Sequence, residues 1–349
     1  MSLLDINFLE NSYSEVKEKQ LFGKWITLGD VRPLYDKLDD SISREVIGKS
    51  EQGRDIFKLK IGNGKKRILI WSQMHGNEST GTKAIFDFLN FYKLFPDNEI
   101  VQRIVENCTI EIVPMLNPDG ALAYTRVNSN NVDLNRDAVD QKACESKILR
   151  KVLDSFNPKF CFNLHDQRTI FGVEGTRNPA TISFLAPSEE VTRKLTKGRK
   201  ETMNVIVAMN ELLQQIIPNH IGRYTDEFYP TATGDNFQKL GHNTILIEAG
   251  HFPDDYKREK TRKFNFYSLL QGIFHIAVSN NFTEHESYFS IPNNEKSFLD
   301  VIHRKPNGND IGFLYKDELI DNQLTSRLQK EKTGNLEEYY GHHEIVFGH

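Results

Sequence analysis

Four nearly continuous apolar runs constrain the fold of this chain more than any other feature of its sequence. The runs lie at 67–71, 108–116, 160–164 and 244–247. Runs of this kind are typical of strands that are covered on both faces of a sheet. Helical patterns separate them around 141–155 and 189–217, and a further helix is expected over 257–279. Alternating strands and helices predict an α/β fold with helices on both faces of the sheet.

The rest of the chain differs in character on the two sides of this region. Residues 1–45 are polar with helical patterns, so we expect an N-terminal helical arm. Residues 46–280 hold the α/β domain, in which Gly62-Asn63-Gly64 is a hairpin signal between two strands. Residues 281–349 consist of short alternating segments with turns, which predict a small β-rich appendix.

Composition excludes several classes of function. The net charge is −4 and the charged fraction is 26%, which argues against a nucleic-acid partner. No apolar run approaches the roughly 20 residues of a membrane span. Asp5 and Glu10 interrupt the N-terminal segment, which therefore does not read as a secretory leader. Together with only three cysteines, this leads us to expect a cytoplasmic location.

Polar clusters stand directly after the four apolar runs, where each strand is expected to end. The clusters are His75-Gly76-Asn77-Glu78, Asn117-Pro118-Asp119-Gly120, His165-Asp166 and Glu248. In an open α/β sheet, ligands bind outside the carboxyl ends of the strands. Four clusters in the same position predict one shared site, in which Asn117 and Gly120 shape a turn.

The clusters contain the ligand types of a catalytic zinc site. Two histidines and one glutamate hold zinc and leave a position open for water, which predicts one zinc ion on His75, Glu78 and His165. Such a metal acidifies its water and polarises a carbonyl. A separate carboxylate must then take the proton of the water, and Glu248 stands where this general base is needed.

The segment 124–137 supplies the cationic groups of the predicted site. Arg126 is placed to stabilise the oxyanion on an attacked carbonyl. Arg136 has the planar fork that grips a carboxylate, and Asn135 beside it adds a hydrogen bond. We interpret Asp133 as a structural carboxylate that braces an arginine.

These pieces together resemble the M14 metallocarboxypeptidase family, the carboxypeptidase A-like zinc enzymes. The pieces that carry the resemblance are 47–56, His75-Gly76-Asn77-Glu78, Asn117-Pro118-Asp119-Gly120, Arg126, Asp133-Leu134-Asn135-Arg136, Leu164-His165 and Ile247-Glu248, in this order. The resemblance implies a mixed, mostly parallel eight-stranded sheet flanked by helices, with one zinc. It also implies a tyrosine that caps the substrate, for which Tyr224 and Tyr229 are candidates, and a specificity residue, for which Asp235 is the candidate.

The sequence thus predicts zinc-dependent hydrolysis of a C-terminal peptide bond, with a metal-activated water and Glu248 as general base. The expected partner is a peptide or an N-acyl amino acid with a free carboxylate. Three alternatives stay open at this point. They are an N-acyl amino acid deacylase like succinylglutamate desuccinylase or aspartoacylase, a murein-peptide amidase, and a catalytically silent metal-binding scaffold.

Overall fold

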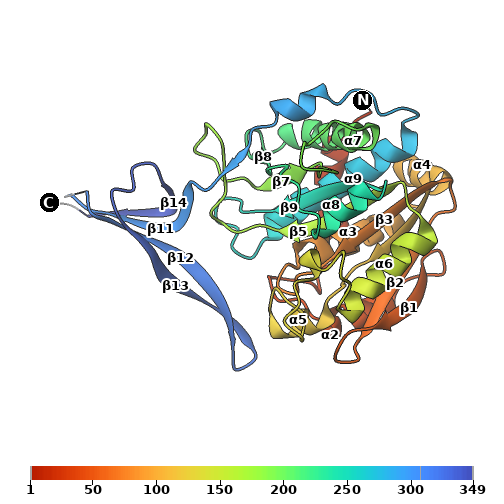
Figure 1. Ribbon diagram of the computed structural model, residues 1–349, viewed down its shortest axis with the longest axis horizontal. Helices are drawn as coiled ribbons and strands as arrows, with labels where there is room; N and C mark the ends of the chain where they lie inside the picture. The colour runs from red at the N-terminus through yellow and green to blue at the C-terminus, as the bar shows by residue number, and fades with distance from the viewer. Residues whose placement is uncertain (1, 307, 348–349) are drawn as a thin grey trace.

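A computed structural model describes residues 2–306 and 308–347 of the chain (Figure 1). Its centre is an eight-stranded sheet in the order β1-β2-β4-β3-β5-β9-β7-β8. The strands are β1 Ser43–Lys49, β2 Asp55–Ile61, β3 Lys66–Ser72, β4 Cys108–Val113, β5 Phe160–Asp166, β7 Ile182–Leu185, β8 Ile221–Arg223 and β9 Asn243–Ala249. Strands β4, β3, β5 and β9 run parallel, and β1, β2 and β7 pair antiparallel. The predicted mixed, mostly parallel sheet is confirmed.

The hairpin predicted at Gly62-Asn63-Gly64 is wrong. Strand β2 ends at Ile61 and β3 begins at Lys66, yet the two are not neighbours, because β4 lies between them. The turn instead packs against the start of β4, where the Gly64 amide donates to the Cys108 carbonyl at 3.0 Å. A β-carbon on Gly64 would lie 2.0 Å from the Asn107 backbone, so this close approach requires glycine.

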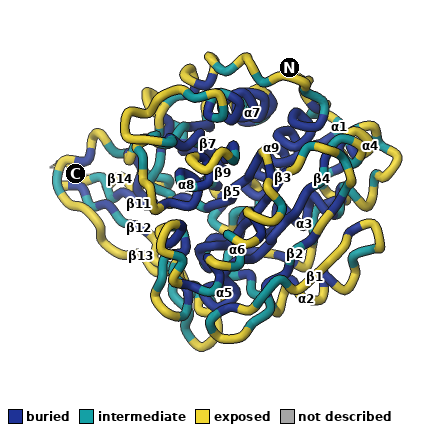
Figure 2. The backbone as a smooth tube through the Cα atoms, turned by 45° about the vertical axis from the view of Figure 1, so that its right-hand side comes forward, coloured by how far each residue is buried: buried dark blue, intermediate teal, exposed yellow. Residues whose placement is uncertain are grey.

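Helices cover both faces of the sheet, as the alternating pattern predicts (Figure 1). The helices are α1 Ile6–Val16, α2 Leu28–Tyr35, α3 Thr80–Leu94, α4 Glu99–Asn107, α5 Pro118–Ala123, α6 Cys144–Phe156, α7 Lys197–Gln214, α8 Thr233–Lys239 and α9 Glu259–Val278. On β3, Ile68 and Ile70 join one core, while Leu69 and Trp71 join the other. The first core includes α3, α7 and α9, and the second includes α6 and α8. Figure 2 shows this buried interior between exposed outer turns.

A buried ion pair ties the N-terminal arm to this core. Arg262 on α9 donates from Nε to Asp87 on α3 at 2.7 Å, and both side chains are fully buried. Both residues of the pair also bond to the N-terminal arm. Arg262 Nη2 donates to the Glu18 carbonyl, and the Tyr13 hydroxyl donates to the Asp87 carboxylate. The arm therefore packs as part of the α/β core, and the expected division into domains at residues 45 and 280 stays a prediction.

We expect Asp87→Ala to lower the free energy of unfolding by about 3 to 5 kcal/mol, because it removes the buried carboxylate closest to the Arg262 guanidinium and leaves only the longer contact with Glu259 at 3.4 Å. Urea denaturation measures this loss. The control Arg103→Ala breaks a surface pair with Glu99 and should cost less than about 1 kcal/mol. Equal losses in the two variants would contradict this account of the arm.

The C-terminal region forms a second sheet in the order β13-β12-β11-β14. Its strands are β11 Phe298–Arg304, β12 Asp310–Ile320, β13 Gln323–Gly334 and β14 Tyr340–Val346. A short pair of strands, β6 Gly172–Val173 and β10 Asn294–Glu295, precedes it. The β-rich character expected of this region is confirmed. No helix among residues 2–306 and 308–347 is long and apolar enough to cross a membrane.

Candidate metal centre

The carboxyl ends of three neighbouring parallel strands bring the predicted site together. His75 follows β3, His165 lies near the end of β5, and Glu248 lies near the end of β9. His165 and Glu248 are register partners on adjacent parallel strands, so their side chains leave the same face of the sheet. The shared edge that the sequence predicts is therefore the place where these groups meet.

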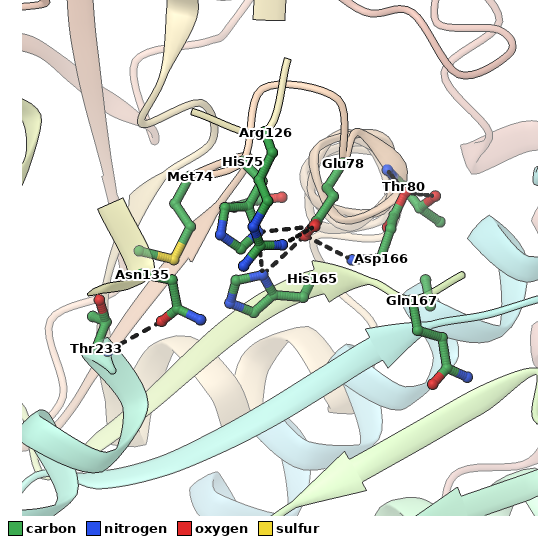
Figure 3. A network of polar contacts seen from close by, with 12 residues as sticks. Met74, His75, Glu78, Thr80, Arg126, Asn135, His165, Asp166, Gln167 and Thr233 are labelled. Atoms are coloured by element: carbon green, nitrogen blue, oxygen red, sulfur yellow. Dashed lines mark hydrogen bonds and ion pairs between the residues drawn. The ribbon is translucent and has the colours of Figure 1, made fainter. Parts of the chain in front are cut away.

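His75, Glu78 and His165 converge on one point (Figure 3). The Nδ1 atom of His75 lies 2.8 Å from Glu78 Oε1, and Nδ1 of His165 lies 2.9 Å from Glu78 Oε2. The two Nδ1 atoms are 3.2 Å apart. A tetrahedral zinc with bonds of about 2.0 to 2.1 Å holds its donor atoms about 3.3 Å apart. The spacing and the chemistry of the two nitrogens and one carboxylate thus fit a zinc ion.

The turn that carries His75 and Glu78 is fixed by close packing against α5. Gly76 lies so near this helix that a β-carbon would come within 1.9 Å of the Gly120 backbone. Asn117 caps α5 by accepting from the Gly120 amide at 2.8 Å, and it donates to the Met74 carbonyl at 3.1 Å. Asn117 and Gly120 therefore form the capped start of α5, against which the turn that carries His75 and Glu78 packs, whereas the sequence predicts that they shape a turn of their own.

Asp133 orients one of the histidines. Its Oδ1 atom lies 3.0 Å from His75 Nε2, and its Oδ2 atom accepts from Arg126 Nε at 3.0 Å. A carboxylate on the remote nitrogen of a histidine fixes the ring and leaves the other nitrogen free to bind metal. The sequence predicts the contact with an arginine but not the contact with His75, because the turn of 128–133 is what returns Asp133 to the first motif.

Arg126 lies directly beside the three converging side chains. Its Nη1 atom donates to Glu78 Oε1 at 3.3 Å, and its side chain is about half exposed. In Figure 3 the Arg126 guanidinium lies among the side chains of His75, Glu78 and His165. The structure therefore places a fixed positive charge beside the converging donor atoms, while the role of Arg126 stays a prediction.

Glu248 faces the same space from β9. Burial raises the pKa of its carboxyl well above the usual range, and the neighbouring Glu78 carboxylate raises it further. His75 and Arg126 act in the opposite direction. A carboxyl whose proton affinity is raised in this way has the property that a general base and acid needs.

Asn135 and Arg136 lie on the short helix η1, Leu134–Arg136, on one side of the centre. Asn135 Oδ1 accepts from the Thr233 amide at 3.1 Å, which leaves its amide group free to donate. The Arg136 guanidinium lies 5.8 Å from the ring centroid of Tyr229 and is exposed. In Figure 3, Asn135 and Thr233 lie to one side of His165, opposite Thr80 and Asp166.

The three residues with the weakest sequence signals have different surroundings. Tyr224 is half-buried, its ring lies 5.2 Å from Phe171, and burial raises the pKa of its hydroxyl. Tyr229 is exposed and donates to Glu227 at 2.9 Å. Asp235 is buried, accepts from the Tyr229 amide at 3.1 Å, and burial raises the pKa of its carboxyl to about 6.

A single cavity of about 860 Å³ joins all of these groups. Its lining includes every candidate site residue, namely His75, Glu78, Arg126, Asn135, Arg136, His165, Tyr224, Tyr229, Asp235 and Glu248. The volume falls in the range of small-molecule sites. The residues are thus brought together, while their individual roles stay predictions.

A second group of residues in this cavity is not identified by any sequence motif. Lys24 comes from the N-terminal arm, Tyr256 from the loop before α9, and Tyr315 and Asp317 from β12. None of these residues stands in a motif. Their only sequence signal is polar or aromatic character within segments that the local pattern assigns to the surface.

Comparisons with known proteins find sequence and fold similarity to carboxypeptidases. The zinc carboxypeptidase family model matches residues 33–178. Carboxypeptidase SOL1 of Arabidopsis thaliana is 30% identical over 173 residues, which cover 43% of this chain and 35% of that protein. A γ-D-glutamyl-L-diamino acid endopeptidase of Lysinibacillus sphaericus is 39% identical over 80 residues, 21% of this chain and 20% of that protein. The chain thus spans about a third or less of the length of these relatives.

A solved structure resembles the chain over a longer stretch. The metallo-carboxypeptidase of Burkholderia cenocepacia superposes with a TM-score of 0.57 and 17% identity, over 71% of this chain and 68% of that one. At this level of identity the likeness concerns the fold alone. It agrees with the eight-stranded sheet and its flanking helices.

Proposed function

We propose that this chain, which belongs to the M14 zinc carboxypeptidase-like family, is a zinc-dependent hydrolase that cleaves the C-terminal amide bond of a peptide. The observation that carries the proposal is the convergence of His75, Glu78 and His165 beside Glu248 in one cavity. Arg126 and Arg136 add two positive charges to the same cavity.

One zinc ion per chain would be held by His75, Glu78 and His165. When bound, zinc supplies a Lewis acid that polarises the scissile carbonyl and acidifies water. The same ligand set also accepts other divalent ions, whose selection depends on availability. The buried carboxylate and the two Nδ1 atoms support zinc, because this donor set is the one that catalytic zinc sites use.

The remaining groups bind and orient the substrate and move its proton. Glu248 takes a proton from water and returns it to the leaving nitrogen. Arg126 binds the oxyanion of the attacked carbonyl. Asn135 and Arg136 hold the terminal carboxylate of the substrate, which sets the bond that is cut.

If the terminal carboxylate of the substrate binds at Asn135 and Arg136, the positions of Tyr229 and Tyr224 suggest a role for each tyrosine. Tyr229 lies against Arg136 and is exposed, so it can close over a bound carboxylate. Tyr224 lies deeper in the cavity, near enough to Glu248 and Glu78 for their charges to raise its pKa further, after burial as the main cause. We assign to Tyr229 the role of the tyrosine that caps the substrate. Tyr224 lines the inner part of the cavity.

We expect Asp235 to favour substrates that end in a basic residue. Burial raises its pKa to about 6, so the carboxyl is neutral below this pH and charged above it. The ratio of kcat/KM for a substrate ending in Lys to one ending in Leu should therefore increase between pH 5 and pH 7. In Asp235→Asn the ratio should fall by about tenfold at pH 7.5 and lose this pH dependence. An unchanged ratio would show that Asp235 does not contact the terminal side chain.

Two other substrates fit the same centre. The relative from Lysinibacillus sphaericus acts, by its name, on γ-D-glutamyl-L-diamino acid bonds, which favours a murein peptide as the second candidate. An N-acyl amino acid is the third, since it also presents an amide next to a carboxylate. A cytoplasmic location stays a prediction from the sequence.

The test is hydrolysis of three substrates by the zinc-loaded protein: a blocked dipeptide, an N-acyl amino acid and a γ-glutamyl-diamino acid peptide. The proposal predicts the highest kcat/KM for the blocked dipeptide. Activity on the acyl amino acid alone would replace the peptidase by a deacylase. A protein that holds zinc and cleaves none of them would be a silent scaffold.

A further inference from the structure

The C-terminal sheet forms one wall of the catalytic cavity. Residues of β12 and β13 line it together with the metal centre, namely Leu314, Tyr315, Lys316, Asp317, Gln329 and Glu331. The centre itself is built from strands β3, β5 and β9. The space available to a substrate is therefore bounded by a segment that lies more than 60 residues beyond Glu248 in the sequence.

Asp317 fastens this wall to the N-terminal arm and to the loop that carries Arg126. It pairs with Lys24, and the two side chains are only 15% and 18% exposed. Tyr124 donates to the same carboxylate at 3.4 Å. On the β13 side, Ser326 donates to the other oxygen of Asp317. Because the pair is largely shielded from water, its attraction is screened less than that of a surface pair.

A second set of contacts fixes β12 at Tyr315. Its amide donates to Asp300 at 2.7 Å, and Tyr256 donates to the other oxygen of Asp300 at 3.1 Å. The rings of Tyr256 and Tyr315 pack edge to face, with centroids 5.0 Å apart. The wall is thus held at two positions of β12, Tyr315 and Asp317.

The wall stands on the side of the centre away from the carboxylate anchor. Asn135 lies on one side of His165 in Figure 3, and Asp166 and Gln167 lie on the other. Arg258 covers this second side, since it donates to the Gln167 carbonyl at 2.6 Å and lies 3.7 Å from Asp166. Tyr256 precedes Arg258 by two residues and contacts the wall.

A substrate whose terminal carboxylate binds Asn135 and Arg136 must extend its acyl side toward this wall. We propose that Asp317 is a positioning residue that holds β12 across the acyl side of the cavity, so that the site accepts substrates with a short acyl group and excludes long peptides. This inference rests on the proposed function. It narrows the substrate class to acyl amino acids and blocked dipeptides or tripeptides.

The test compares kcat/KM for a blocked dipeptide and a blocked hexapeptide with the same two C-terminal residues. The zinc-loaded wild-type protein should prefer the dipeptide by about tenfold or more. Asp317→Ala and Lys24→Met should each reduce this ratio to within about threefold, mainly by lowering KM for the hexapeptide. Lys330→Met is the matched control for Lys24→Met, because Lys330 is exposed on β13 and lies outside the residues that line the cavity, and it should keep the wild-type ratio.

Equal wild-type rates on the two peptides, or a ratio that both variants leave unchanged, would overturn the inference. Calorimetry of the same peptides binding to the Glu248→Gln variant measures their affinities without requiring turnover. If neither peptide is cleaved but the dipeptide binds more tightly than the hexapeptide, the proposed hydrolase function is wrong and the exclusion of long peptides by the wall is supported. If both peptides are cleaved and bound equally well, the proposed function is supported and the exclusion of long peptides by the wall is wrong.

Discussion

Glu248→Gln should lower kcat by about 10³-fold while the protein keeps its metal and its affinity for substrate. Glutamine has nearly the same shape as glutamate, so the packing of β9 against β5 is preserved. It has no carboxylate, however, and cannot take a proton from water or return it to the leaving nitrogen. Steady-state kinetics with a blocked dipeptide, together with metal analysis of the same sample, separates these effects.

The control for this variant is Glu211→Gln, which makes the same chemical change on the exposed side of α7, outside the cavity. Its kcat should stay within about twofold of the wild type. If Glu248→Gln retained more than about a tenth of the wild-type kcat, another group would be the base. The general-base role of Glu248 would then be wrong even if the metal centre were right.

His165→Ala should remove the metal and with it all measurable hydrolysis. The side chain provides one of three converging donor atoms, and its Nδ1 lies within 3.2 Å of the corresponding atom of His75. Two remaining ligands do not make the site that catalytic zinc uses. We expect the zinc content after dialysis to fall from about one to below about 0.1 per chain.

His251→Ala provides the matched control for the metal. His251 is also buried and lines the same cavity, but it is not part of the converging donor group in the described chain. This variant should keep its zinc. Full zinc content in His165→Ala, or loss of zinc in His251→Ala, would show that the metal binds elsewhere.

The sequence predicts the part of this site that depends on strand ends. Each strand run ends in a polar cluster, and parallel neighbours bring such clusters to one edge, so His75, Glu78, His165 and Glu248 could be joined without coordinates. The α/β class with helices on both faces follows from the same runs, whereas the mixed, eight-stranded sheet is what the family resemblance implies. What these patterns do not determine is which strands are partners, and the misassigned hairpin at Gly62-Asn63-Gly64 shows why. A turn signal reports the local backbone, whereas the insertion of β4 between β2 and β3 depends on contacts with a segment far along the chain.

Local sequence patterns cannot predict the contacts that hold the cavity wall, for the same reason. Lys24 and Asp317 are 293 residues apart in the sequence, and each is an ordinary charged residue in its own segment. Only the docking of the arm and of β12 against the α/β core makes them partners. Asp133 is an intermediate case, because its contact with Arg126 is local while its contact with His75 joins two motifs.

The most direct measurement of the central claim is anomalous diffraction from crystals of zinc-loaded protein at the zinc absorption edge. We expect one strong peak per chain, within bonding distance of His75 Nδ1, His165 Nδ1 and a Glu78 oxygen, with the Glu248 carboxylate facing it. A peak at any other group of residues, or no peak after zinc has been added in excess, would show that these three side chains do not form the zinc site.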